Sequence, residues 1–194
     1  MSKPVHLDLT HPRLVLASSS PYRRDLLERL QIPFAVEVPS VDESASYGEL
    51  PSNLARRLAR AKALAVADLC PGRFIVGSDQ VVDIDGQVVS KPGDFDRACA
   101  QLRAVSGKSL CFHTALCVVA PDGGLRERTV DTQVWFRTLD EASIVAYVAQ
   151  ERPYDCAGAF KVERLGITLI EKISSADSTA LIGLPLIALV TLSC

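Results

Sequence analysis

The stretch RLVLASSSPYRRDLLERL, residues 13–30, decides how the fold begins. The apolar run at 13–18 has the length of a short buried strand. Three leucines recur at helical spacing near the end of the whole stretch. Ser20 is suited to cap that helix, and Pro21 to occupy its first position, where a missing N–H costs nothing. The stretch therefore predicts a strand, a tight turn and a helix.

Downstream, strands and helices alternate first and hairpins then dominate. A helix is predicted from Pro51, with Ser52 as its cap and an apolar stripe along one side. A buried strand is predicted to end at Asp79, before a hairpin turned at Asp85-Gly86. Two longer alternating segments then form a second antiparallel pair. This pattern favours an α/β fold with a mixed sheet flanked by helices, in a single domain of residues 1–194 with room for two lobes.

Charge and composition argue against several classes of protein. The formal net charge is -2 and the pI about 5.9, so there is no overall cationic field to hold nucleic acid or an anionic membrane. Residues 1–12 contain no apolar segment followed by a cleavage site, so we expect a cytoplasmic protein. The apolar tail at 181–194 falls short of the roughly 20 residues that span a bilayer. The six cysteines show no CxxC spacing and are expected as reduced thiols.

Two adjacent arginines, Arg23 and Arg24, fall in the first turn of the first predicted helix. Cations there are unfavourable by a few tenths of a kcal/mol up to about 1 kcal/mol, because the helix dipole is already positive at that end. The hydroxyls of 18–20, the free N–H groups of the helix and the two guanidinium groups all suit phosphate oxygens. The alternative is a capped surface helix whose arginines point into water.

Other polar residues are ambiguous when taken singly. Asp79, at the predicted end of a strand, can hold a divalent cation or orient a water, or it can start a loop by bonding its own backbone. Lys62 lies beside the apolar stripe of its helix, where it can reach phosphates or snorkel, and Arg57 flanks the other side. Lys91, before a proline, points to nothing by itself.

Three potential soft ligands, Cys111, His113 and Cys117, alternate onto one face of a predicted strand. Such a set could suggest a metal site. Three ligands at this unusual spacing argue against zinc.

Seven short stretches, taken in order, resemble the Maf family of nucleoside triphosphate pyrophosphatases. They are LVLASSSPYRRDLL, VDES, LARAKA, IVGSDQVV, SKP, CAGAFKVERLGI and GLPL, and they are spread in order along nearly the whole chain. The resemblance implies hydrolysis between the α and β phosphates of a nucleoside triphosphate, with a divalent cation, usually Mg²⁺ and alternatively Mn²⁺. It also implies a mixed α/β, inosine-triphosphatase-like fold with the site in a cleft, often in a homodimer.

The same resemblance assigns roles residue by residue. The catalytic and metal-binding carboxylates fall on Asp79 and Glu43. The phosphate-binding groups fall on Ser18, Arg23, Arg24, Lys62 and Lys91, with Arg24 the weaker match. Cations so placed would neutralise charge on the leaving pyrophosphate while the carboxylates position metal and water for in-line attack. Whether Asp79 is base, metal ligand or both is left open.

The family branches by base specificity, and Tyr22, Gln80 and Glu163 resemble the 7-methyl-GTP branch. The dTTP/UTP branch would show arginine, threonine and glutamine there. N7-methylguanine carries a positive ring that an aromatic face attracts, and its N1–H and 2-amino groups suit a carboxylate. The chain departs from the branch in having Tyr22 for a common tryptophan and Arg164 for glycine. Two alternatives remain: a pyrimidine or broader pyrophosphatase, and a non-catalytic nucleotide-binding regulator of cell division.

Overall fold

The computed structural model describes residues 13–193 of the 194-residue chain. The stretch 1–12, on which the expectation of no secretion signal rests, and Cys194 lie outside the described residues. Within 13–193, no helix combines the length and apolar character needed to cross a membrane.

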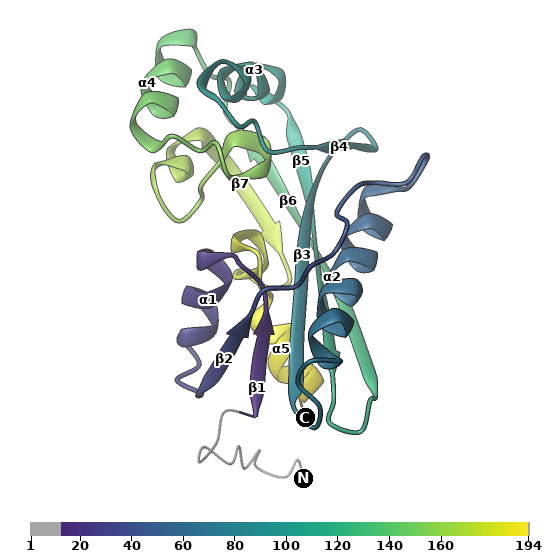
Figure 1. Cartoon of the computed structure of the whole chain (residues 1–194). Coiled ribbons are helices and arrows are strands. Elements are labelled where there is room, and N and C mark those ends of the chain that lie inside the picture. The colour runs from purple at the N-terminus through teal and green to yellow at the C-terminus, as the bar shows by residue number, and fades with distance from the viewer. Residues whose placement is uncertain (1–12, 194) are drawn as a thin grey trace.

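Within residues 13–193, seven strands form one sheet (Figure 1), and it is mixed, as the sequence predicted. Its strands are β1 (Leu14–Ala17), β2 (Phe34–Glu37), β3 (Phe74–Ile84), β4 (Gln87–Val89), β5 (Ser109–Val119), β6 (Leu125–Phe136) and β7 (Ile170–Ser175). The order is β2-β1-β3-β5-β6-β7, with β4 paired to β3. β1 is parallel to β2 and β3, whereas the β3-β5, β5-β6 and β6-β7 pairs are antiparallel. The early strand-helix alternation gives the parallel part, and the hairpins give the rest.

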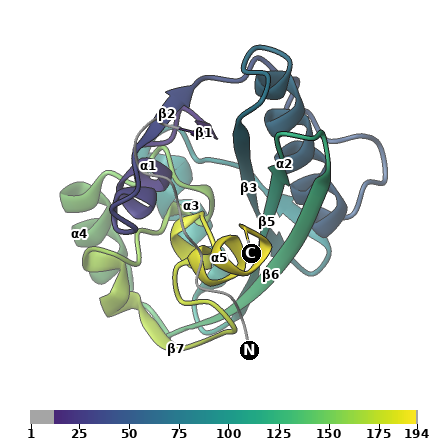
Figure 2. The same ribbon diagram turned by 90° about the horizontal axis from the view of Figure 1, so that it is seen from below.

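Helices cover both faces of the sheet. Figure 2 shows α2 (Pro51–Ala67) on one side of β3 and β5 and α5 (Leu186–Ser193) on the other, where α1 (Pro21–Glu28) also packs. Beyond them, α3 (Phe95–Val105) and α4 (Glu141–Glu151) enclose a further core at the far end of the long strands. Short 3-10 turns at Ala157–Ala159, Leu165–Leu169 and Ala180–Ile182 complete the chain.

The first unit forms as the sequence predicted. Ser20 caps α1, its side chain accepting a hydrogen bond from the Arg23 amide at 3.4 Å, and Pro21 is the first helical residue. Leu26 and Leu27 are fully buried against the sheet. Residues 18–20 therefore separate the end of β1 from the start of α1, and this short turn fixes the direction in which the N-terminus of α1 points.

The predicted cap of α2 was wrong. Leu50 is the N-cap residue and makes no side-chain cap hydrogen bond, while Pro51 takes the first helical position. Ser52 therefore stands inside the helix rather than before it. The proline fixes the helix start because its φ is already helical and it has no N–H to leave unpaired.

Gly77 lets α2 lie directly on β3. A Cβ built there would stand 2.3 Å from the Ala59 carbonyl oxygen and 2.7 Å from the Ala63 nitrogen, both backbone atoms of α2. We expect Gly77→Ala to lower the free energy of unfolding by about 2–3 kcal/mol, because the helix must shift as a body. Thermal unfolding would show it as a Tm drop of about 5 °C or more. Gly124→Ala, where a Cβ meets the exposed Asp122 carboxylate, is the matched control and should leave Tm nearly unchanged.

Candidate active site

The site lies at a gap along one edge of β3. β1 pairs with that strand only as far as Gly77, and β4 pairs with it only from Val82 onward. Between them, residues 78–81 have no strand partner on this edge within the described part of the chain. Ser18 follows the end of β1 and Lys91 follows β4 closely, so both approach the gap from its two sides. The gap is a natural opening for a ligand.

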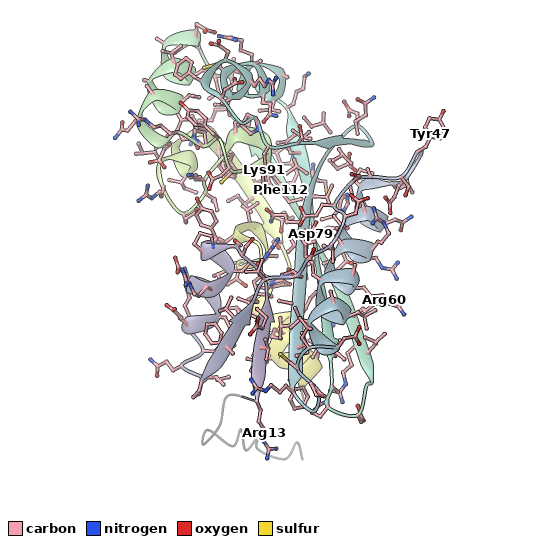
Figure 3. The ribbon with its side chains drawn as sticks, in the orientation of Figure 1. Arg13, Tyr47, Arg60, Asp79, Lys91 and Phe112 are labelled. Carbon is pink, nitrogen blue, oxygen red and sulfur yellow. The ribbon has the colours of Figure 1, made fainter. Side chains whose placement is uncertain are left out.

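Asp79 lies within this gap, and its predicted position at a strand end was wrong. β3 continues to Ile84, through the residue, and the Asp85-Gly86 hairpin follows as predicted. The strand that ends here is β1, which leaves Asp79 beyond the last parallel pair. Asp79 and Gln80 face opposite sides of the sheet, as neighbours in a strand must. Figure 3 shows Asp79 and Lys91 near the middle of the molecule, whereas Arg60 of α2 points outward.

Lys62 joins the two predicted carboxylates. Its Nζ donates to Asp79 Oδ1 at 2.6 Å and lies 2.6 Å from Glu43 Oε1. The side chains of Lys62 and Asp79 are 7% and 10% exposed, and that of Glu43 is 58% exposed. The lysine is therefore a buried cation held by two carboxylates. The alternative of snorkelling to solvent is wrong for this residue.

Arg57, which the pattern could not distinguish from Lys62, is elsewhere engaged. Its guanidinium donates to both carboxylate oxygens of Glu49, at 2.8 and 2.9 Å, and to the Ser44 carbonyl. This pairing orders the loop that carries Glu43 into α2. Burial by itself would raise the pKa of Glu43, but the hydrogen bond and charge of Lys62, with Lys91 and Arg23, outweigh it and lower that pKa.

Arg23 enters the site from the N-terminus of α1. Its Nε donates to the Gly183 carbonyl at 2.9 Å and its NH1 to Ser18 Oγ at 3.4 Å. Burial lowers the pKa of Arg23, and the charges of Asp79 and Glu43 oppose that shift. Arg24 is exposed and does not line the cavity beside Arg23. Of the two arginines, the structure brings Arg23 to the other predicted phosphate-binding groups and leaves Arg24 at the surface.

The predicted specificity residues meet at one cavity. Tyr22, Gln80 and Glu163 all line an open cavity of about 140 Å³, which Arg23 and Lys91 also line. Gln80 is fixed there, since its Nε2 donates to Thr114 Oγ1 and to the carbonyls of Ala180 and Leu181. The Lys62-centred carboxylates do not line this cavity. Arg23 and Lys91 line the cavity and also interact by charge with Glu43, so the cavity and the carboxylates adjoin.

Asp155 and Lys161, which the sequence reading did not assign to the site, hold Tyr22 in place. The Tyr22 hydroxyl donates to Asp155 Oδ2 at 3.0 Å, and Lys161 Nζ lies 3.1 Å from Asp155 Oδ1 and 5.8 Å from the centre of the Tyr22 ring. Burial raises the pKa of Tyr22 to about 12, so the phenol stays protonated. The stretch 155–166, DCAGAFKVERLG, supplies both residues, but their contacts with Tyr22 cross more than 130 residues of sequence.

Arg164 does not interfere with Glu163. Its NH1 lies 3.9 Å from Glu151 Oε2, on α4, and its backbone has φ −132°. That φ is open to any residue, so glycine is not required at this position. The departure from the branch pattern at Arg164 therefore leaves the Glu163 carboxylate beside the cavity.

Known proteins match this chain over nearly its whole length. The family model described as Maf-like protein matches residues 13–193. A 7-methyl-GTP pyrophosphatase of Bordetella avium is 56% identical over 180 residues, 92% of this chain and 90% of that protein. One of Pseudomonas syringae pv. tomato is 52% identical over 180 residues, 92% of this chain and 94% of that protein. A Mycobacterium abscessus dITP/XTP pyrophosphatase structure aligns with a TM-score of 0.41 and 17% identity, over 65% of this chain and 75% of that one.

Proposed function

We propose, from the premise that this chain belongs to the Maf family, that it is a hydrolase of 7-methyl-GTP, releasing 7-methyl-GMP and pyrophosphate. Relatives at 50–56% identity over more than nine-tenths of this chain bear that activity in their names. The observation that carries the proposal is local: Tyr22, Gln80 and Glu163 line one cavity, and Arg23, which lines the same cavity, interacts by charge with Asp79 and Glu43 of the Lys62 cluster. A base subsite and a phosphate subsite would thus adjoin.

The triphosphate would cross the gap in the edge of β3. Ser18, Arg23 and the N-terminal end of α1 would receive phosphate oxygens, with Lys91 on the opposite side. A water oxygen would form the new bond to the α-phosphorus, and the bond from that phosphorus to the bridging oxygen would break. Pyrophosphate leaves with the electron pair, and neighbouring cations stabilise its charge.

The carboxylates fit a hard divalent cation. Asp79 and Glu43 offer oxygen ligands, and within residues 13–193 neither Asp79 Oδ2 nor Glu43 Oε2 accepts a hydrogen bond from another residue. When bound, Mg²⁺ or Mn²⁺ would polarise the phosphates and neutralise the leaving group. Asp79 would orient the attacking water or accept its proton. Lys62 would hold both carboxylates in position, since each lies 2.6 Å from its Nζ.

The base would lie against Tyr22. A cationic N7-methylguanine ring is attracted to an aromatic face, and the Tyr22 hydroxyl is already anchored by Asp155. Glu163 would accept hydrogen bonds from N1–H and the 2-amino group, and charge-assisted bonds of this kind are among the stronger ones. The nearby carboxylates of Asp155 and Glu163 also favour a positive ring over the neutral ring of GTP.

The substrate assignment is tested by pyrophosphate release with Mg²⁺ on 7-methyl-GTP, GTP, dTTP, UTP and CTP in parallel. We expect the highest kcat/KM for 7-methyl-GTP. A preference for dTTP or UTP would keep the family and overturn the substrate. Failure to hydrolyse any of the five, by a protein that still binds nucleotide, would favour a non-catalytic regulator. Replacing Mg²⁺ with Mn²⁺ tests which cation is preferred, and adding a chelator tests whether a divalent cation is required.

Replacing the carboxylate of Glu163 should weaken base selection. We expect Glu163→Gln to lower kcat/KM for 7-methyl-GTP by about 10–100-fold, because the loss of one charge-assisted acceptor costs about 1.5–3 kcal/mol. The ratio of kcat/KM for 7-methyl-GTP to kcat/KM for GTP should fall, since the negative charge of Glu163 favours the methylated ring. Arg164→Gly is the matched neighbour control and should leave both values unchanged, because Arg164 faces Glu151. Equal losses on 7-methyl-GTP and GTP would contradict the role in specificity.

A homodimer and a cytoplasmic location complete the proposal. The dimer rests on the resemblance to the Maf family, and the location stays the expectation made from the sequence. Light scattering of the purified full chain, coupled to gel filtration, measures the oligomeric state. A monomer at all concentrations would contradict the dimer without affecting the substrate assignment.

A further inference from the structure

A second group of metal-binding side chains lies on the α2 face of the sheet, near the hairpin end of β3. Cys111 and His113 belong to β5, and Asp131 belongs to β6 directly opposite His113. Their Sγ, ring nitrogen and carboxylate oxygen atoms all lie within 4.8 Å of one another. Cys111 Sγ is 3.9 Å from His113 Nδ1, which is 2.7 Å from Asp131 Oδ1. The three atoms therefore converge on one point.

The register of β5 against β6 brings Asp131 to Cys111 and His113. The sequence had suggested Cys117 as the third member of this group. Cys117 shares the face with Cys111 but lies four residues beyond His113, where it is 1% exposed in the core against α2. The third converging atom comes instead from β6. The sequence predicted that this segment pairs with β5, but the register that puts Asp131 opposite His113 is given only by the structure. The argument against a Cys111, His113 and Cys117 zinc site therefore holds for that set and does not apply to this one.

We propose that Cys111, His113 and Asp131 bind one divalent transition-metal ion of the zinc type, in a site separate from the nucleotide cavity. A thiolate, an imidazole and a carboxylate are ligands that zinc takes with four-coordinate geometry, leaving one position for water. The sulfur selects against Mg²⁺, which prefers oxygen ligands alone. None of the three residues lines the cavity that holds Tyr22 and Glu163.

Asp83 supplies the outer support that metal-bound histidines have. Its Oδ2 lies 3.2 Å from His113 Nε2, so that nitrogen can donate its N–H to Asp83 while Nδ1 gives its lone pair to the ion. Asp83 lies opposite Cys111 across the β3-β5 pair. The His113 side chain is 12% exposed and thus held in this orientation from both sides.

The site has an entrance and room to adjust. Asp131 is 63% exposed and also lines an open cavity of about 330 Å³ beside the start of α2. Its carboxylate can therefore turn from its contact with His113 Nδ1 toward an ion about 2 Å from each nitrogen and oxygen ligand. A bound ion would join β5 and β6 directly, and β3 through Asp83. Its expected effect is to stabilise this end of the sheet.

The experiment titrates Co²⁺ into the purified full chain in the presence of excess Mg²⁺. We expect one equivalent to produce a near-ultraviolet thiolate-to-cobalt absorption band that Zn²⁺ removes. Cys111→Ser should abolish the band, and Cys70→Ser, the matched control, should keep it. Asp83→Asn should weaken Co²⁺ binding by about 10–100-fold. Zn²⁺ at a hundredfold excess over Kd should raise Tm by about 5 °C or more in the unmodified protein.

Asp131→Asn keeps the test informative if Cys111→Ser folds poorly. This side chain is largely exposed, so the variant should fold, yet it should lose the zinc-dependent rise in Tm. A band that persists in Cys111→Ser would overturn the proposal. So would a band lost only in Cys156→Ser, since that cysteine lines the nucleotide cavity, or the absence of any band in the unmodified protein.

Discussion

Asp79→Asn is expected to lower kcat for pyrophosphate release by about 10³-fold, within the 10²–10⁴-fold range that positioned acid-base groups contribute. Asparagine keeps the shape and can still accept the hydrogen bond that Lys62 Nζ donates to Oδ1. It removes the negative charge needed to hold a cation or to take a proton from water. The measurement is steady-state pyrophosphate release on 7-methyl-GTP with Mg²⁺.

The nucleotide affinity of this variant distinguishes a catalytic role of Asp79 from a structural one. Because the base cavity does not include Asp79, the affinity for 7-methyl-GTP measured without turnover should stay within a few fold of the original. Asp68→Asn, at the exposed end of α2, is the matched control and should be fully active. Retained turnover in Asp79→Asn would contradict a catalytic role for this residue. Loss of both folding and nucleotide affinity would instead mark Asp79 as structural.

Local patterns were enough to predict the parts of the fold that short segments control. The strand, cap and helix of 13–30 and the Asp85-Gly86 turn each depend on residues a few positions apart. The cap of α2 was predicted wrongly because Pro51 starts that helix before Ser52 can cap it. Hydrogen-bonding ability alone therefore does not locate a helix start next to a proline.

The site was harder to predict because it depends on where different strands stop. Nothing in IVGSDQVV says that β1 pairs with β3 only as far as Gly77 and that β4 pairs with β3 only from Val82 onward. The opening at Asp79 is a property of the assembled sheet. Family resemblance located the residues without explaining the opening. The support of Tyr22 by Asp155 and Lys161 likewise joins segments that are distant in sequence.

Lys62 and Arg57 illustrate the same limit within one helix. Both flank the apolar stripe of α2, and their spacing gave no reason to prefer either. In the folded chain Lys62 is buried between carboxylates, whereas the Arg57 side chain is 40% exposed and pairs with Glu49. Burial, which decides how much a charge pair matters, depends on which neighbour the helix packs against.

Lys62→Met is expected to reduce both stability and activity severely. Methionine fills most of the space but removes the cation, leaving the Asp79 carboxylate, 10% exposed, without its partner. Breaking such a pair from one side costs about 3–5 kcal/mol. Without the ammonium, Asp79 and Glu43 also repel each other, so we expect kcat to fall by about 10²-fold or more. Urea unfolding and pyrophosphate release measure the two effects.

A double variant and a pH series identify the cause. Lys62→Met with Asp79→Asn should recover much of the lost stability and none of the activity, because it removes both charges.

Lys62 contributes to lowering the pKa of Glu43 below its usual 4.5, so this contribution to stability exists above that pH and is lost as the pH falls through the lower folded value. The stability gap between Lys62→Met and the original should therefore narrow below about pH 4.5. Arg57→Met, which removes an exposed cation from the same helix, should cost less than about 1 kcal/mol. Equal losses in the two single variants would show that helix packing, rather than the buried charge pair, explains the effect.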